Sequence, residues 1–182
     1  MLTVVIILVI DMDINLKKPK KSDLDSLAST IKTFGAVTTP YLENAISFSN
    51  LYKTTGLESY RKEAIENVNS FEHIMRLYSV SLQEMLKDLT GFIKETVKEI
   101  TYDSLSGEFH DRLEGLLEET TRPIDLSYLK TYKEYMENLK EDKSGYRENV
   151  KLLEKTKEDF YNYIKNTSSN LSDVIKSLFT EE

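Results

Sequence analysis

The stretch from Ile124 to Phe179 constrains the fold of this chain more than any other part of its sequence. It runs for 56 residues with no proline and with one glycine, Gly145. Steps of alternately three and four residues meet an apolar or aromatic side chain at twelve of fifteen positions, which keeps a hydrophobic seam over seven heptads. Such a seam is typical of a coiled coil. The seam positions are Leu129, Tyr132, Met136, Leu139, Lys143, Tyr146, Val150, Leu153, Lys157, Phe160, Ile164, Thr167, Leu171, Val174 and Leu178.

A single helix over this stretch would be about 84 Å long, at ~1.5 Å per residue. A compact globule of 182 residues is shorter than that, so this helix must lie against other long helices of its own chain or of a second copy. Two further segments fit this role, at about 23–53 and 57–119. In the first, eight of nine seam positions from Leu24 to Tyr52 fit the pattern. In the second, a seam starts at Ala64 and shifts by one residue after Phe92.

These segments predict an all-α fold, an elongated antiparallel bundle of three long kinked helices with coiled-coil packing. The third helix would cover 124–180, and residues 22–182 would form a single helical domain. Gly35 and Pro40 predict a kink near residues 35–39, because proline removes a backbone donor and clashes with the preceding turn. The seam keeps its phase there, which favours a kinked helix over two separate ones. The polar stretch 101–107 is a place where the second segment can break.

Residues 1–21 are predicted to form an N-terminal apolar arm and a lysine-rich linker. The run Leu2–Ile10 is too short to span a bilayer, and the alternation up to Leu16 favours a short strand. Three interpretations stay open for this arm. It is a strand or arm packed on the bundle or on a second chain, a disordered or non-native segment, or an insertion into a membrane interface. The linker is either a solvated connection or a polybasic patch for anionic lipid. Its lysines are Lys17, Lys18, Lys20 and Lys21.

The composition argues against an enzyme. The net charge of −7 disfavours a nucleic acid partner. The chain has no cysteine, its two histidines are far apart, and we find no phosphate-binding loop or nucleophile–base pair. We therefore expect no catalytic residues, cofactor, metal site or small-molecule substrate. The lack of cysteine is compatible with a cytoplasmic protein. Peripheral association with a membrane is compatible with the same location. Glycosylation acceptor patterns at Asn166 and Asn170 are interpreted as chance matches within a helix.

Three long helices, together with the stretch Leu86–Lys94 ahead of a helix bend, resemble the BAR (Bin–amphiphysin–Rvs) family of membrane-shaping domains. The resemblance implies an antiparallel dimer that forms a curved six-helix bundle. It also implies binding to curved anionic membranes through basic residues on the concave face and distal tips. In this chain, the basic residues that would serve are Lys17, Lys18, Lys20 and Lys21 in the arm, with Arg122, Lys130 and Lys133 near the second turn.

The alternative is a coiled-coil scaffold or adaptor subunit whose seams are completed by another protein, without direct membrane binding. The same heptads support it, and so does the acidity of the second segment, where most of the negative charge lies. We also expect a homodimer, because a long seam on a single chain would otherwise stay exposed, and further protein partners are possible. The residues expected to form the self-association surface are Phe160, Ile164 and Leu171.

Overall fold

The chain is all-helical over the residues that its computed structural model describes, which are 19–100, 111, 115–116, 118, 122, 124–139 and 145–179. Within them lie four helices, α2 (Lys21–Thr55), α3 (Glu58–Ile100), α5 (Ser127–Glu137) and α6 (Tyr146–Phe179). The predicted all-α class is therefore confirmed. The predicted N-terminal strand falls within residues 1–18, outside the described ranges.

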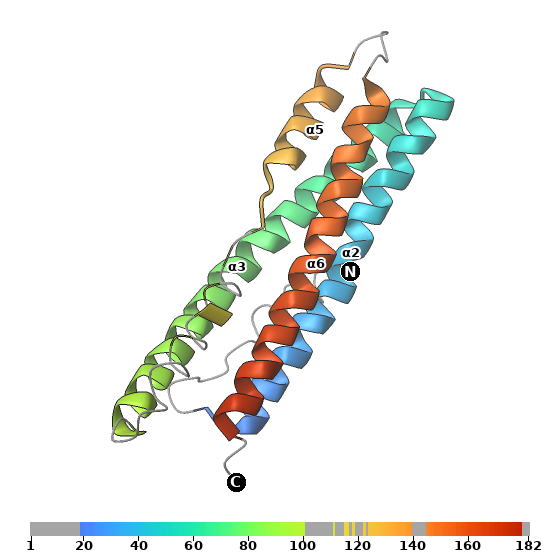
Figure 1. The fold of residues 1–182 in the computed structure, drawn as a ribbon. Helices are drawn as coiled ribbons and strands as arrows, with labels where there is room; N and C mark the ends of the chain where they lie inside the picture. The colour runs from blue at the N-terminus through green and yellow to red at the C-terminus, as the bar shows by residue number, and fades with distance from the viewer. Residues whose placement is uncertain are drawn as a thin grey trace.

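The helices run side by side in alternating directions (Figure 1). α2 packs along both α3 and α6, and α5 packs against α6 and the first part of α3. α2 begins beside the end of α6, so these two long helices are antiparallel.

Local signals in the sequence set the limits of α2. At its start, the backbone N–H of Lys20 donates to Asp23 Oδ2 over 2.8 Å, which satisfies one of the donors left free at a helix N-terminus. At its end, Gly56 adopts a left-handed conformation with φ of 72° and donates to the Tyr52 carbonyl over 2.8 Å. Pro40 lies inside the helix without ending it, as the unbroken seam predicted.

Aromatic side chains from three helices join at the centre of the core. The rings of Phe34 and Tyr78 stack with centroids 3.7 Å apart. Phe160 meets the edges of Phe34 and Phe71 at centroid distances of 6.2 and 5.2 Å. Such contacts add to the burial of large apolar surfaces, so the seams of α2, α3 and α6 close on one another within one chain.

The predicted single helix over 124–180 is wrong, because α5 and α6 are separate and antiparallel (Figure 1). Gly145, directly before α6, has φ of 76°, a conformation that glycine adopts without strain and that a continuing right-handed helix excludes. The cation–π contact of Lys155 Nζ with the Tyr128 ring, 5.2 Å from its centroid, joins residues that one straight helix would hold far apart. Most seam residues are nevertheless buried on both helices, among them Leu129, Tyr132 and Met136 on α5 and Tyr146, Leu153 and Phe160 on α6.

Beyond Ile100, the second predicted segment is only partly described. Helical backbone recurs at Asp111, Gly115, Leu116 and Glu118, and Leu116 packs against the core. The predicted weak point at residues 101–107 lies outside the described residues.

Polar contacts tie α5 to its neighbours. Arg61 of α3 donates to the Met136 carbonyl over 2.7 Å, a favourable place for a cation because carbonyls are left free at a helix C-terminus. The Tyr132 and Ser49 hydroxyls are 2.7 Å apart, and the Tyr146 hydroxyl donates to the Ser49 carbonyl over 2.6 Å. This buried group joins α2, α5 and α6.

Candidate functional site

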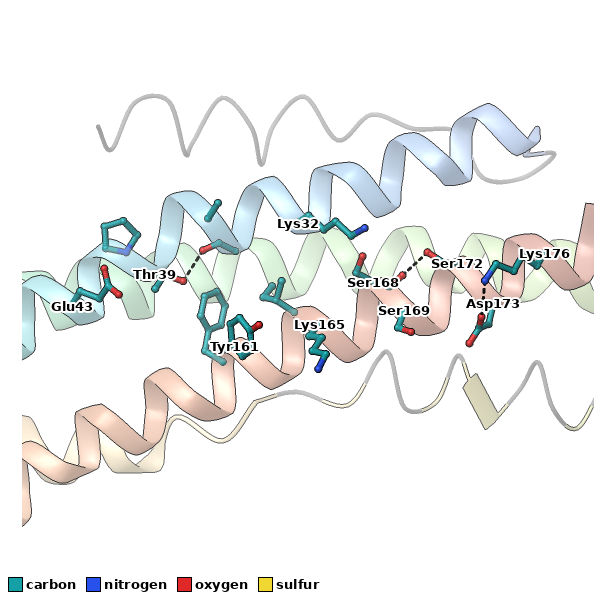
Figure 2. A pocket seen from close by; sticks show the side chains of 15 residues that line it. Lys32, Thr39, Glu43, Tyr161, Lys165, Ser168, Ser169, Ser172, Asp173 and Lys176 are labelled. Atoms are coloured by element: carbon teal, nitrogen blue, oxygen red, sulfur yellow. Dashed lines mark hydrogen bonds and ion pairs between the residues drawn. The ribbon is translucent and has the colours of Figure 1, made fainter.

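A groove of about 850 Å³ lies between α2 and α6. Figure 2 shows it from its open side, with α3 behind the two helices. We call it the α2–α6 groove. Its lining residues are Lys32, Gly35, Ala36, Thr39, Pro40 and Glu43 from α2, with Phe160, Tyr161, Ile164, Lys165, Ser168, Ser169, Ser172, Asp173 and Lys176 from α6.

The floor of the groove is the place where α2 and α6 touch. A Cβ atom placed on Gly35 would lie 2.7 Å from Ile164 Cγ2 and 3.1 Å from Ile164 Cγ1. No real side chain tolerates such a distance, so glycine is what allows this close approach. The floor is therefore apolar and closed, and the space lies above it on the face away from α3.

One hydroxyl group beside the floor has no hydrogen-bond partner. Ser168 is 2% exposed and its Oγ atom is unpaired, although its backbone carbonyl accepts a bond from Ser172 Oγ over 2.9 Å. Figure 2 draws Ser168 on the side of α6 that faces α2. A buried polar atom without a partner lowers the stability of the fold by about 1–3 kcal/mol. A new hydrogen bond to Ser168 Oγ would therefore be favourable.

Pro40 creates a second polar position in the groove. Proline has no N–H, so the carbonyl of Ala36, one turn earlier, cannot receive the usual helical bond from residue 40. The neighbouring Gly35 carbonyl accepts an additional bond from Thr39 Oγ1 over 2.8 Å. Ala36 and Pro40 both line the groove, so the carbonyl that lacks its helical donor belongs to a groove residue.

Three lysines and two acidic residues line the groove. Of the two acidic residues, Glu43 pairs with Lys157 at 3.6 Å and Asp173 pairs with Lys176 at 3.5 Å. Lys32 on one rim and Lys165 on the other are exposed, and neither forms an ion pair with any described residue. Tyr161, 63% exposed, adds a large aromatic ring to the same edge as Lys165.

The residues predicted to bind a membrane do not form one surface. Lys17 and Lys18 lie outside the described residues, whereas Lys20 and Lys21 are exposed at the start of α2. Lys130 and Lys133 are on α5, beside the first half of α6, and therefore far from that end of the bundle (Figure 1).

The basic residues near the second predicted turn are also partly engaged. Lys133 forms an ion pair with Glu72 and donates to Asn69 Oδ1 over 3.1 Å, so its charge is balanced within the chain. Lys130 lies 3.8 Å from Glu134, so of these three residues only Arg122 is an exposed cation without a carboxylate partner in the described residues.

The three residues predicted for self-association lie in the core of a single chain. Phe160 is 0% exposed, Ile164 is 9% exposed and packs against Gly35, and Leu171 is 1% exposed. The expectation that they lack cover within the chain is wrong, because α2 covers this part of α6. The homodimer itself stays a prediction.

Of the groove residues, only Phe160 and Ile164 were singled out from the sequence, and they were predicted for self-association and not for a groove. Gly35 and Pro40 were noted as interruptions of a helix, and Ser168 appeared within a chance glycosylation pattern. The clustering of short side chains at 35–39 and at 168–172 is the signal that could have indicated a shallow helix surface.

Comparisons with protein-family models, curated proteins and solved structures find no match to this chain. The BAR resemblance therefore stays a hypothesis, and the functional argument rests on geometry alone.

In the described ranges, no helix combines the length and apolar character needed to cross a membrane. The same residues contain no group of three or more acidic, histidine or cysteine side chains placed to hold a metal ion.

Proposed function

We propose that this chain is a helical scaffold or adaptor that binds a helix of another protein in the α2–α6 groove. The observation that carries the proposal is an open groove with an apolar floor, a lysine on each rim and an unpaired hydroxyl group, Ser168 Oγ. A hydroxyl group left unpaired beside a groove is a position at which a docked chain gains a hydrogen bond that the free protein lacks.

The shape of the groove supports a helix as its occupant. Two packed helices leave a valley between them, and a third helix lies in such a valley by ridges-into-grooves packing. From Phe160 to Lys176 the α6 side extends about 24 Å, which equals more than four helical turns. Amphipathic helices commonly bind hydrophobic grooves of this kind.

Membrane binding through a BAR-like surface is the competing hypothesis. Among its described candidates, Lys20 and Lys21 lie at the start of α2, whereas Lys130 and Lys133 lie on α5 beside the first half of α6, and Lys133 is paired with Glu72. Electrostatic binding to lipid depends on clustered basic residues, so we favour the adaptor function over membrane binding.

A selection from a display library tests the proposal. The library consists of alanine-based helical peptides of about 18 residues, ~27 Å long, with the positions of one face and of both its flanks randomised. Peptides are selected on the wild-type protein and then scored on two variants. Ser169→Trp fills the groove from an exposed position, and Asn166→Trp places the same ring on an exposed position of α6 outside the groove.

We expect the selection to yield helical peptides that bind the wild-type protein and the Asn166→Trp variant equally well. These peptides should no longer bind the Ser169→Trp variant. Circular dichroism of both variants shows whether they keep the fold. If no enriched peptide separates the two tryptophan variants, the groove does not bind helices and the proposed function is rejected.

A further inference from the structure

We propose that the helix bound in the α2–α6 groove is acidic, with a carboxylate on each flank that pairs with Lys32 and Lys165. This inference rests on the proposed function and adds the chemistry of the partner. It commits to a helix of a different protein, one that has apolar side chains towards the groove floor and a hydroxyl or amide group near Ser168.

Two lysines at the rims of the groove have no ion-pair partner among the described residues, and their charge favours an acidic helix. Glu43 and Asp173, the acidic residues that line the groove, each have a lysine partner already, Lys157 and Lys176. Lys32 belongs to α2 and Lys165 to α6, so on either side of the floor stands one ammonium group that forms no ion pair with a described residue (Figure 2). A helix with acidic residues on both flanks meets both groups, and a basic helix meets repulsion on both sides.

The same charges argue against a second copy of this chain that docks through its own α2–α6 groove. The face that a second copy would present from its own groove also has Lys32, Lys165 and Tyr161 at its rim. Like charges placed opposite one another in an interface suppress the wrong partner. The charge pattern therefore selects a helix of opposite sign.

Two separate polar groups near the groove floor, the Ser168 hydroxyl group and the Ala36 carbonyl, favour a polar residue on the docked helix. Ser168 Oγ has no partner, and the Ala36 carbonyl lacks the helical bond that Pro40 cannot make. A wholly apolar helix would leave both groups unsatisfied after docking. A serine, threonine, asparagine or glutamine in the middle of its buried face can donate to the carbonyl and bond to the hydroxyl group, which also fixes the register of the helix.

The experiment uses the peptides that distinguish Ser169→Trp from Asn166→Trp. Their flank positions are counted against the unselected library, and a representative peptide is titrated by fluorescence anisotropy at low and at raised salt. The titration compares the double variant Lys32→Glu/Lys165→Glu with a control, Lys62→Glu/Lys87→Glu. The control changes the net charge equally at exposed α3 positions away from the groove.

We expect Asp and Glu to be enriched on both flanks and a polar residue at one central position. Affinity should fall about tenfold or more in the groove variant, because two attractions become two repulsions. It should change by less than about twofold in the control, whose charges lie outside the contact.

Groove-dependent peptides with neutral or basic flanks, or equal losses in the two charge variants, would overturn this inference and leave the proposed function standing. An absence of groove-dependent peptides would reject both. A single substitution, Ser168→Ala, then tests the register, since it should weaken peptides with the central polar residue more than those in which that residue is alanine.

Discussion

Single side chains decide how closely the helices of this protein approach one another. Gly35 lets α2 rest on Ile164 of α6, and Phe34 beside it stacks on Tyr78 of α3. Close packing of this kind makes the core sensitive to one added methyl group. The groove floor and the core thus depend on the same short stretch of α2.

Replacing Gly35 by alanine should destabilise the protein by about 1–3 kcal/mol, because the new methyl group would clash with Ile164. Alanine normally stabilises a helix interior relative to glycine by about 0.5–1 kcal/mol. Gly91→Ala in α3 is the matched control, since nothing lies within 4 Å of its added Cβ. Chemical denaturation measures both changes.

We expect Gly91→Ala to leave the free energy of unfolding unchanged or to raise it. In an Ile164→Ala background, the loss caused by Gly35→Ala should largely disappear, because the clashing atoms are gone. Equal effects of the two glycine substitutions would mean that α2 and α6 do not touch at Gly35.

Tyr132 gives the stability of the fold a dependence on alkaline pH. Burial raises the pKa of its hydroxyl group to about 12, despite the hydrogen bond with Ser49. In the unfolded chain the pKa is about 10. Between these values the unfolded state loses the proton and the folded state keeps it, so the free energy of unfolding falls as pH rises from about 10 to 12.

The loss due to Tyr132 should be about 2–3 kcal/mol at most. The denaturation midpoint of Tyr132→Phe should therefore fall less steeply with rising pH than that of the wild-type protein. Midpoints measured from pH 8 to pH 12 check this. At neutral pH the variant should lose only about 1 kcal/mol, since Ser49 Oγ keeps its bond to the Ala45 carbonyl. An unchanged alkaline slope would show that this hydroxyl group is not buried.

At the level of elements, hydrophobic periodicity predicted which residues are buried but not how the helices are divided. The seam positions of α2, α3, α5 and α6 are largely in the core, from Leu24 to Val174. The seam continues from Leu139 to Tyr146, seven residues later, and so hides the break between α5 and α6. Periodicity identifies the buried face of a helix and carries no information about its direction.

Gly145 and the polar residues before it were the available signal for this break, because glycine with a positive φ often ends or precedes a helix. The groove was harder to anticipate. Gly35 and Ser168 are 133 positions apart, and only tertiary packing brings their helices together. An unpaired hydroxyl group is likewise a property of the packed structure and not of local sequence.

Spin labels at Tyr128→Cys and Lys155→Cys test the reversal between α5 and α6. The chain has no cysteine of its own, so labelling is specific. One continuous helix would separate the two backbones by about 40 Å, whereas the contact of Lys155 with the Tyr128 ring predicts well under half of that. A measured distance close to 40 Å would instead support the single long helix that the sequence predicted over 124–180.

At the level of the whole molecule, the bundle closes its core within one chain and leaves a large groove in its described part. Ile164, predicted for a dimer surface, packs within the core, so Ile164→Asp should unfold the monomer rather than merely separate two copies. A dimer, if formed, requires other surfaces.

Sedimentation with vesicles separates the adaptor function from the BAR-like hypothesis. We expect the sedimenting fraction to be the same with neutral and with anionic vesicles at low salt, because Lys133 is engaged and the basic residues are dispersed. Replacing Lys17, Lys18, Lys20 and Lys21 by serine should change nothing. Binding that requires anionic lipid, fades with salt and is lost in this variant would favour the membrane hypothesis.

The most direct test of the account maps a selected acidic helix onto the isotope-labelled protein by NMR. We predict that the backbone amide signals of 32–43 in α2 and 160–176 in α6 shift as the peptide is added, because these segments line the groove. Signals of Arg122, Lys130 and Lys133 should stay in place. Shifts confined to these basic residues, with the groove signals unmoved, would contradict the central claim.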